Sequence, residues 1–247
     1  MAAGMQALGT SLGGFIARQR GTRFPRLVVS QGGASEVEQP PSAVAGVFLH
    51  TDGPRNEMVT SRDLVLALHQ SAIGRVVMLA ADAGAGALGS VELGRALTRA
   101  GLSCIVVDLS GDERIAAAMG VGPNGPGLSA FADGRATLAD VIHRDGRSHC
   151  HVVPSTGGRT TPDSPDAALV LAACTEAYDC TLVALDRNEL ACLPALLDAE
   201  TAIVVSGEAT RTGSLGQIGD ALQALGVDDL LYMQCAEVRT AAPIPAQ

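Results

Sequence analysis

Residues 75–90 read RVVMLAADAGAGALGS, and this stretch decides the fold. Its first half is a continuous apolar run, its middle is rich in glycine, and SVELGRALTRAG at 90–101 has the apolar spacing of a helix. A strand that is apolar throughout, with no polar alternation, is covered on both faces. The order of strand, glycine-rich turn and helix is therefore typical of the first unit of an α/β fold.

The same alternation of apolar strands and helices continues toward the C-terminus. Further strands are predicted at 104–109, 151–155, 181–186, 201–207 and 229–234, and further helices at 61–72, 164–178 and 214–225, with Ser61 as the N-cap of the first. Buried strands that alternate with helices form parallel sheets with right-handed crossovers. We therefore expect an α/β domain over residues 61–237, with a doubly wound, mostly parallel sheet.

The two ends of the chain differ from this domain in composition. Residues 1–60 are predicted to be an irregular N-terminal extension and linker, rich in Gly, Ser, Pro and Glu from residue 30 onward, and 238–247 a flexible tail. No apolar run approaches the roughly 20 residues that cross a bilayer. The Arg-containing segment before residue 30 is compatible with a tail, a peripheral helix or the cytoplasmic flank of a membrane segment. We expect a cytoplasmic chain, either free or peripheral at the inner membrane.

The composition excludes one class of partner and one class of chemistry. The chain has 247 residues with 26 acidic against 17 basic ones, so its formal charge is −9. A general nucleic-acid binder needs a basic face, and no nucleic-acid partner is expected. Every one of the 17 basic residues is arginine. Chemistry that needs a lysine from this chain is therefore excluded.

The cysteines do not indicate a disulfide framework or a metal centre. The 6 cysteines are scattered and contain no CxxC pair, which favours buried, reduced thiols. His149, Cys150 and His151 are the best candidate ligands, but alternation along a strand places the two histidines on one face and Cys150 on the other. No further ligands follow at zinc-like spacing, so no metal site is expected.

The loop after the first strand has the position of a phosphate-binding loop. Glycines such as Gly84 and Gly86 allow successive N–H groups to converge, and the following helix adds partial positive charge. A working loop also needs a lysine and a Ser or Thr on magnesium. Here Ala87 and Leu88 stand after Gly86, and Asp82 adds a negative charge at the loop entrance. The loop is then a packing turn, a residual nucleotide site or an active site, in that order of preference.

Two further carboxylates lie at the ends of predicted strands. Asp108 ends CIVVDL and Asp186 ends TLVALD. In phosphoryl transfer such carboxylates hold magnesium or orient the attacking water. An Asp at a strand end also caps a following helix, which is the more common role for either one alone. Because both occur at successive strand ends beside a glycine loop, we favour descent from a phosphate-handling site.

The order of these segments resembles a known family. VVDLSGDERIAAAMG, GPGLSAFADGRATLADVIHRDG, HVVPSTGG and TLVALDRNE follow the glycine loop. This order is similar to the cytoplasmic domain of bacterial tyrosine autokinases, which belong with the polysaccharide co-polymerases in the MinD/ParA-like deviant P-loop superfamily. The resemblance covers about residues 61–235 and implies a P-loop NTPase-like fold of the MinD/ParA type.

The resemblance assigns roles to the loop and shows what is missing from it. Gly84 and Gly86 match the first Walker motif, its lysine falls on Ala87 and its hydroxyl residue on Leu88.

The resemblance also covers the acidic positions. Asp108 matches the first Asp of the family's DxD motif, whose second Asp is Ser110 here, and Asp186 matches the Walker B Asp. The family's C-terminal tyrosine cluster is absent, because the only tyrosines are Tyr178 and Tyr232. Both the ATP clamp and the phosphate acceptor are thus degraded.

These features imply a catalytically degenerate member of the family, a scaffold or regulator in bacterial exopolysaccharide biosynthesis and export. We predict no catalytic residue, no metal, and a vestigial nucleotide site at Gly84, Gly86, Asp108 and Asp186 that binds ATP or ADP weakly or not at all, without Mg²⁺. The expected partners are membrane-embedded synthesis or export components, and the chain forms a homodimer or pairs with an intact paralogue.

Two alternatives remain open. One is an ATP-dependent, tyrosine-kinase-like enzyme that uses Arg75, Arg95 or Arg114, or a partner's residue, in place of the lysine. The other is a MinD-like protein that positions a membrane machine.

Overall fold

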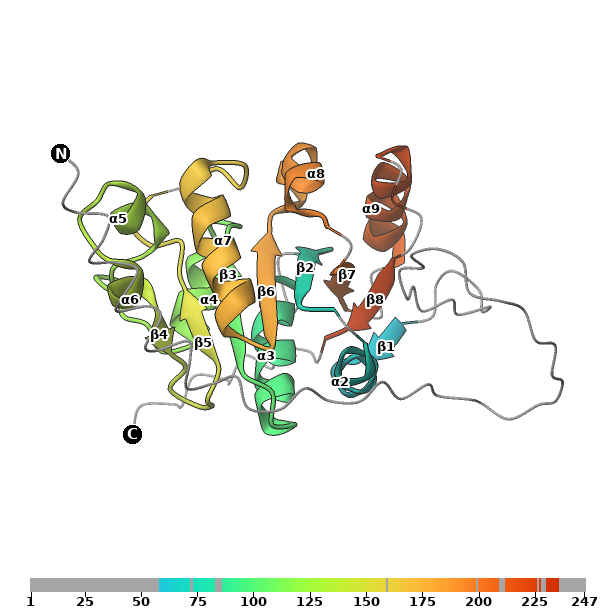
Figure 1. The fold of residues 1–247 in the computed structure, drawn as a ribbon. Coiled ribbons are helices and arrows are strands. Elements are labelled where there is room, and N and C mark those ends of the chain that lie inside the picture. Colours follow the sequence, from blue (N-terminus) through green and yellow to red (C-terminus); the bar gives the residue numbers. More distant parts are fainter. Residues whose placement is uncertain are drawn as a thin grey trace, which may run out of the picture.

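One mixed sheet forms the centre of the molecule (Figure 1). The computed structural model describes residues 58–71, 73–82, 86–158, 160–198, 200–208, 212–225, 227 and 230–235. The strands are β1 (Met58–Thr60), β2 (Arg75–Ala80), β3 (Cys104–Asp108), β4 (His143–Arg144), β5 (His151–Val153), β6 (Cys180–Leu185), β7 (Thr201–Gly207) and β8 (Leu231–Gln234). They lie in the order β1-β8-β7-β2-β6-β3-β5-β4.

The predicted parallel sheet is confirmed. Strand β2 pairs in parallel with both β6 and β7, so that Val77 lies between Val183 and Ile203. Strand β3 pairs in parallel with β6 and β5. Only the short strand β4 runs antiparallel, against β5.

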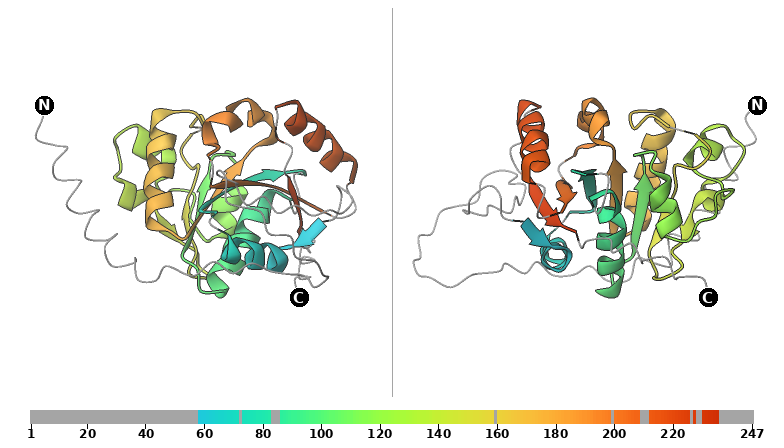
Figure 2. Two further views of the ribbon diagram at one scale, coloured as in Figure 1. Left: turned by 45° about the vertical axis from the view of Figure 1, so that its right-hand side comes forward. Right: turned by 180° about the vertical axis from the view of Figure 1, so that it is seen from behind.

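Helices cover both faces of this sheet, as a doubly wound fold requires (Figure 2). One face carries α2 (Ser61–Gln70), α3 (Gly89–Arg99) and α4 (Glu113–Ala118). The other carries α5 (Leu128–Ala132), α6 (Leu138–Val141), α7 (Pro165–Ala177), α8 (Leu193–Leu196) and α9 (Thr212–Ala224). Two short 3₁₀ segments, η1 (Gly86–Leu88) and η2 (Arg187–Cys192), follow the ends of β2 and β6.

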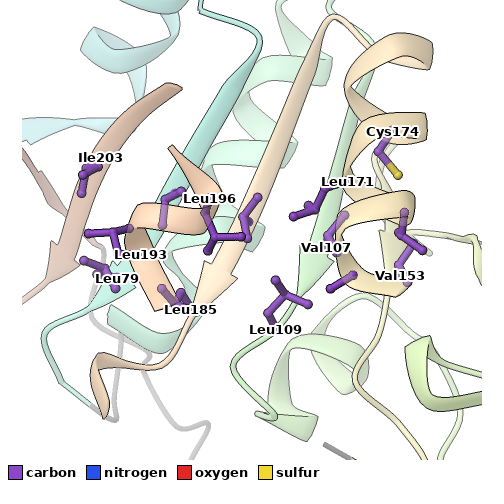
Figure 3. Packing of buried hydrophobic residues seen from close by; sticks show 14 of the residues in the cluster. Leu79, Val107, Leu109, Val153, Leu171, Cys174, Leu185, Leu193, Leu196 and Ile203 are labelled. Carbon is purple, nitrogen blue, oxygen red and sulfur yellow. The ribbon is translucent and has the colours of Figure 1, made fainter. Parts of the chain in front are cut away.

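The core consists of two aliphatic layers, because the side chains of each buried strand alternate between the two faces. Val77 and Leu79 of β2 point into the layer under α7 and α8, part of which Figure 3 shows. Val76 and Met78 point into the layer under α2 and α3. Strand β3 is buried at every position, which explains why its sequence shows no polar alternation.

The structure corrects the N-terminal boundary of the domain. We expected residues up to 60 to be linker, but Met58–Thr60 form β1 and pair with β8. The expected N-cap at Ser61 is wrong by one residue, because the Thr60 side chain accepts a hydrogen bond from the Asp63 N–H (3.3 Å) and the Thr60 N–H donates to Asp63 Oδ2 (3.0 Å). A three-residue edge strand is too short to show a hydrophobic period. The rest of the predicted N-terminal extension and the tail at 238–247 lie outside the described residues.

Within the part of the chain that the structure describes, no helix combines the length and the apolar character needed to cross a bilayer.

Candidate functional site

The carboxyl ends of β2, β3, β6 and β7 meet at one edge of the sheet and surround a small cavity. Its volume is about 200 Å³. Its wall includes Asp82, Gly86, Ser110, Arg114, Asp186 and Ser206. This is the edge at which doubly wound α/β proteins bind ligands. Of the four predicted site residues, Gly86 and Asp186 line the cavity, Asp108 is not among its lining residues, and Gly84 lies outside the described residues.

Gly86 is required by close packing. A Cβ atom at this position would lie 2.5 Å from the Ser206 carbonyl oxygen and 3.1 Å from Asp82 Oδ2. The Ser206 hydroxyl also donates to the Gly86 carbonyl oxygen over 2.8 Å, which ties the loop to the end of β7. These contacts support the interpretation of the glycine as a packing residue, because no larger side chain fits between the loop and β7.

Asp82 has a role that sequence reasoning missed. We expected its charge to stand at the entrance of the loop, but the residue is buried, with 6% of its surface exposed. Its Oδ1 accepts the Gly86 N–H (3.1 Å) and its Oδ2 accepts the N–H of Glu208 after β7 (3.0 Å). An N–H group of the loop, the kind of donor that cradles a phosphate, is thus bonded to a carboxylate of the same chain.

Asp108 does not line the cavity and is fully buried. Its Oδ1 accepts the N–H (3.0 Å) and hydroxyl (2.7 Å) of Ser110, a lining residue, and its Oδ2 accepts the Ser155 hydroxyl (2.8 Å). Burial raises the pKa of Asp108 above its ordinary value, although these hydrogen bonds act in the opposite direction. The arrangement joins the ends of β3 and β5 through a hydrogen-bonded carboxyl group.

Asp186 lines the cavity and also caps the next element. Its Oδ1 accepts the Asn188 N–H over 2.8 Å, as the N-cap of η2. The capping role expected of an isolated Asp at a strand end is therefore present. Arg187 and Asn188, which follow Asp186, also line the cavity.

Arg114 is the candidate arginine that reaches the cavity. Its Nη2 lies 2.5 Å from Asp112 Oδ2, and its Nε donates to Asp112 Oδ1 over 2.9 Å. Burial raises the pKa of Asp112, but the hydrogen bonds and the charge of Arg114 outweigh it, and the pKa lies below its ordinary value. A cation is thus present beside the loop, already paired with a carboxylate.

The two other candidate arginines form ion pairs and hydrogen bonds away from the cavity. Arg75, at the opposite end of β2, donates to Asp198 Oδ2 (2.8 Å) and Thr175 Oγ1 (3.1 Å). Arg95 on α3 forms a bidentate pair with Asp145 over 2.9 and 2.8 Å. Neither lines the cavity.

The cysteines and histidines form no metal centre among the described residues. All six cysteines are free. Cys150 is buried in the core under α3, whereas His149 and His151 line a second pocket, although His149 and Cys150 precede β5 and only His151 belongs to it.

The parallel sheet, its order and the glycine loop at its carboxyl edge define the class: an α/β fold of the P-loop NTPase type found in MinD/ParA proteins. The VpsO kinase domain is similar to this chain with a TM-score of 0.59 and 17% identity, over 71% of this chain and 91% of that one. The kinase domain of the Escherichia coli tyrosine kinase Etk is similar with a TM-score of 0.52 and 14% sequence identity, over 74% of this chain and 76% of that one. A chain of the MinC:MinD cell division complex of Aquifex aeolicus is similar with a TM-score of 0.50 and 15% sequence identity, over 64% of this chain and 67% of that one.

These likenesses establish the fold that the sequence motifs imply. No family model matches the chain, and no curated protein matches it by sequence.

Proposed function

We propose that this chain is a catalytically degenerate P-loop-type protein that acts through protein contacts, as a scaffold or regulator in bacterial exopolysaccharide biosynthesis and export. The observation that carries the proposal is the position of Asp82, whose carboxylate holds the Gly86 N–H. Gly84, Gly86, Asp108 and Asp186 are then the remains of a nucleotide site.

The energetics of the loop support loss of nucleotide binding. A phosphate group would have to displace Asp82 from the Gly86 N–H or approach it as a like charge. Two unit charges 4 Å apart interact by about 4 kcal/mol near a protein surface. Such repulsion is normally offset by a lysine and by a Ser or Thr hydroxyl that binds Mg²⁺, and Ala87 and Leu88 supply neither. A single charge-assisted hydrogen bond from such a cation to a phosphate would contribute roughly 1.5–3 kcal/mol to binding.

The biological setting of the proposal rests on the similarity of this chain to solved kinase domains and on the family resemblance of its sequence. The fold is shared with the VpsO kinase domain and with the tyrosine kinase Etk, and the resemblance noted in the sequence adds the polysaccharide co-polymerases. We place the chain in the cytoplasm or peripherally at the inner membrane, in contact with membrane-embedded synthesis or export components. It forms a homodimer or pairs with an intact paralogue that retains the ATP clamp.

The direct test is a titration of the purified chain with ATP and Mg²⁺, followed by calorimetry and thermal unfolding. A ligand that binds the folded state raises its stability by RT ln(1 + [L]/Kd). We expect a flat response for the wild type and for Asp186→Asn, which removes a charge from the same cavity, keeps an N-cap and leaves Arg114 in its ion pair. We expect Asp82→Asn to bind ATP more tightly than either, because it removes the carboxylate that competes for the loop. Magnesium-dependent ATP hydrolysis or autophosphorylation by the wild type refutes the proposal.

The position of Arg114 favours an enzyme as the second candidate. Arg114 lines the cavity from α4, and in this candidate its guanidinium would leave Asp112 and supply the charge of the missing lysine. A rigid planar fork fits a tight loop less well than an ammonium group, which is why this candidate ranks second. ATP hydrolysis that develops only on mixing with a partner subunit, and that is lost in Arg114→Gln, would establish it.

The likeness to MinD favours the third candidate, a positioning protein for a membrane machine. Loss of membrane association on deletion of residues 1–30 would support it, and a uniformly cytosolic full-length chain would exclude it.

A further inference from the structure

A second, larger pocket lies at the opposite edge of the sheet from the glycine loop. Its volume is about 420 Å³, and its wall is formed where α3 and α7 end and where β3 and β5 begin. It is lined by Leu102, Cys104, Arg144, His149, His151 and Tyr178, among others. This volume lies within the range of small-molecule sites in proteins.

The charge of this wall contrasts with that of the molecule. The chain carries a formal charge of −9, yet the titratable side chains that line the pocket are one arginine, two histidines, a tyrosine and a cysteine, with no carboxylate. Two carboxylates follow lining residues in sequence without lining the pocket themselves. Asp145 is paired with Arg95, and Asp179 accepts the N–H (2.8 Å) and hydroxyl (2.7 Å) of Ser103, which is one of the lining residues.

Hydrogen bonds orient the two imidazoles and make Nε2 the donor of His149 and, in the tautomer in which the Tyr178 hydroxyl donates, of His151. Arg144 Nη2 lies 2.7 Å from His149 Nδ1, and since a guanidinium only donates, Nδ1 accepts and the proton of neutral His149 is on Nε2. His151 Nδ1 pairs with the Tyr178 hydroxyl over 2.8 Å, with the two rings edge to face. His151 Nε2 has no hydrogen-bond partner among the described residues.

The electrostatics of His151 favour an incoming anion. Burial lowers the pKa of His151, and the neighbouring Arg144 and His149 lower it further. The other titratable groups at the wall are the thiol of Cys104 and the hydroxyl of Tyr178, whose pKa values are both raised by their surroundings, so neither supplies a negative charge at neutral pH. A bound anion would be the opposite charge that this cluster lacks.

Some of the carbonyl groups at the ends of α3 and α7 are already engaged within the chain. At the end of α3, carbonyl groups accept the N–H groups of Ala100, Gly101 and Leu102, and at the end of α7 the Cys174 carbonyl accepts the Tyr178 N–H. Because a helix C-terminus carries a partial negative charge, an anion in this pocket has to be held by Arg144 and the two imidazoles.

We propose that this pocket binds a small organic phosphate, with Arg144 and the imidazoles of His149 and His151 on the phosphate group and the apolar wall at Leu102 and Ala177 against its carbon skeleton. Arginine suits a phosphate because its fork donates two parallel hydrogen bonds. The volume is too large for a bare ion and fits a phosphorylated metabolite. The site is separate from the glycine loop and does not depend on the proposed function.

The test uses ribose 5-phosphate as the probe, with ribose and inorganic phosphate as its two halves, in calorimetric titrations of the full chain. We expect ribose 5-phosphate to bind one to one, more tightly than inorganic phosphate, and ribose not to bind. Arg144→Gln should weaken binding by about tenfold or more, because it removes the fork. Arg147→Gln is the matched control, since it removes the same charge from an exposed side chain of the same turn that does not line the pocket.

A second readout places the ligand. The imidazole ¹⁵N signals of His149 and His151 should shift on titration, while those of His69 on α2 should not. No binding of the probe up to about 10 mM overturns the proposal. Equal loss of affinity in both arginine variants, an unchanged affinity in Arg144→Gln, or equal binding of inorganic phosphate and ribose 5-phosphate also overturns it. Thermal unfolding of each variant without ligand shows whether it is folded.

Discussion

At the scale of single residues, the aspartates near the carboxyl edge of the sheet have different structural roles. Asp82 bonds to the loop backbone, Asp108 bonds to two serines inside the protein, and Asp112 and Asp186 cap the elements that follow them. In each case a carboxylate that could serve a nucleotide is used to join neighbouring segments. The hydrogen-bond partner, and not the residue type, decides what each carboxylate does.

The buried carboxyl group of Asp108 leads to a prediction about pH. Its folded-state pKa lies above the ordinary value of 3.8, so its ionisation at neutral pH opposes folding, and this cost disappears as the pH falls through the folded-state pKa. Asn at this position keeps acceptors for Ser110 and can donate to Ser155. We expect Asp108→Asn to raise the melting temperature at pH 7 and to have a smaller effect at pH 4, as measured by thermal unfolding.

Asp186→Asn is the control for this experiment, because Asn is as good an N-cap as Asp and Asp186 is not fully buried. A lower melting temperature for Asp108→Asn at pH 7 would contradict the structural role and favour a role in which the charge is required.

At the scale of elements, ion pairs differ in what they connect. The pair between Arg95 and Asp145 joins α3 to the turn between β4 and β5, with the Asp145 side chain fully buried and 22% of the Arg95 side chain exposed. The pair between Arg135 and Asp133 lies two residues apart in one turn and is exposed, at 61% and 59%. Burial makes the first pair a structural link and leaves the second to solvent screening.

Removing the cation of the buried pair should be costly. Arg95→Met leaves the Asp145 charge inside the protein, and we expect a loss of about 3 kcal/mol in the free energy of unfolding, measured by urea denaturation. Arg135→Met should cost about 0.5 kcal/mol or less. Similar losses in both variants would show that α3 is not anchored through Asp145.

The same pair has a defined pH dependence. Burial raises the pKa of Asp145, but its hydrogen bonds to Arg95 and Ser148 and the Arg95 charge outweigh burial, and the pKa lies below 3.8. Its stabilising contribution is therefore complete above the unfolded-state pKa and is lost as the pH falls through the folded-state value. The stability difference between the wild type and Arg95→Met should be constant near neutrality and shrink below about pH 4.

At the scale of the whole molecule, the sheet begins earlier than the composition indicates. Strand β1 closes one edge through its parallel pairing with β8, and Thr60, its last residue, caps α2. The N-terminal and C-terminal parts of the folded domain are thus joined directly. Figure 1 shows β1 and β8 side by side at that edge of the sheet.

Truncation tests this closure. A chain that starts at residue 57 keeps β1 and the cap, and we expect it to unfold at the temperature of the full chain. A chain that starts at residue 61 loses both, and we expect it to be less stable by at least about 1 kcal/mol, the usual contribution of an N-cap. Equal melting temperatures for the two truncated chains in calorimetric scans would show that β1 contributes nothing to the domain.

Much of the fold followed from local patterns. The apolar strands at 75–81, 104–109 and 181–186 predicted β2, β3 and β6, because an uninterrupted apolar run is a property of neighbouring residues. The edge strands β1 and β4 were not predicted, since runs of three and two residues carry no period. At the site, Ala87 and Leu88 after Gly86 were visible in the sequence and led to the prediction of a vestigial nucleotide site.

By itself, the sequence determined that this protein is a doubly wound α/β molecule with a glycine-rich segment after a buried strand and no lysine, since strand burial, helix spacing and residue types are all encoded locally. Only the tertiary structure decided that Asp82 occupies the loop, because its second partner, Glu208, lies 126 residues further along the chain. The basic pocket with Arg144 and His151 likewise exists only once β4, β5 and the end of α7 are brought together. Contacts between distant segments depend on which strands become neighbours, and a hydrophobic pattern leaves that order open.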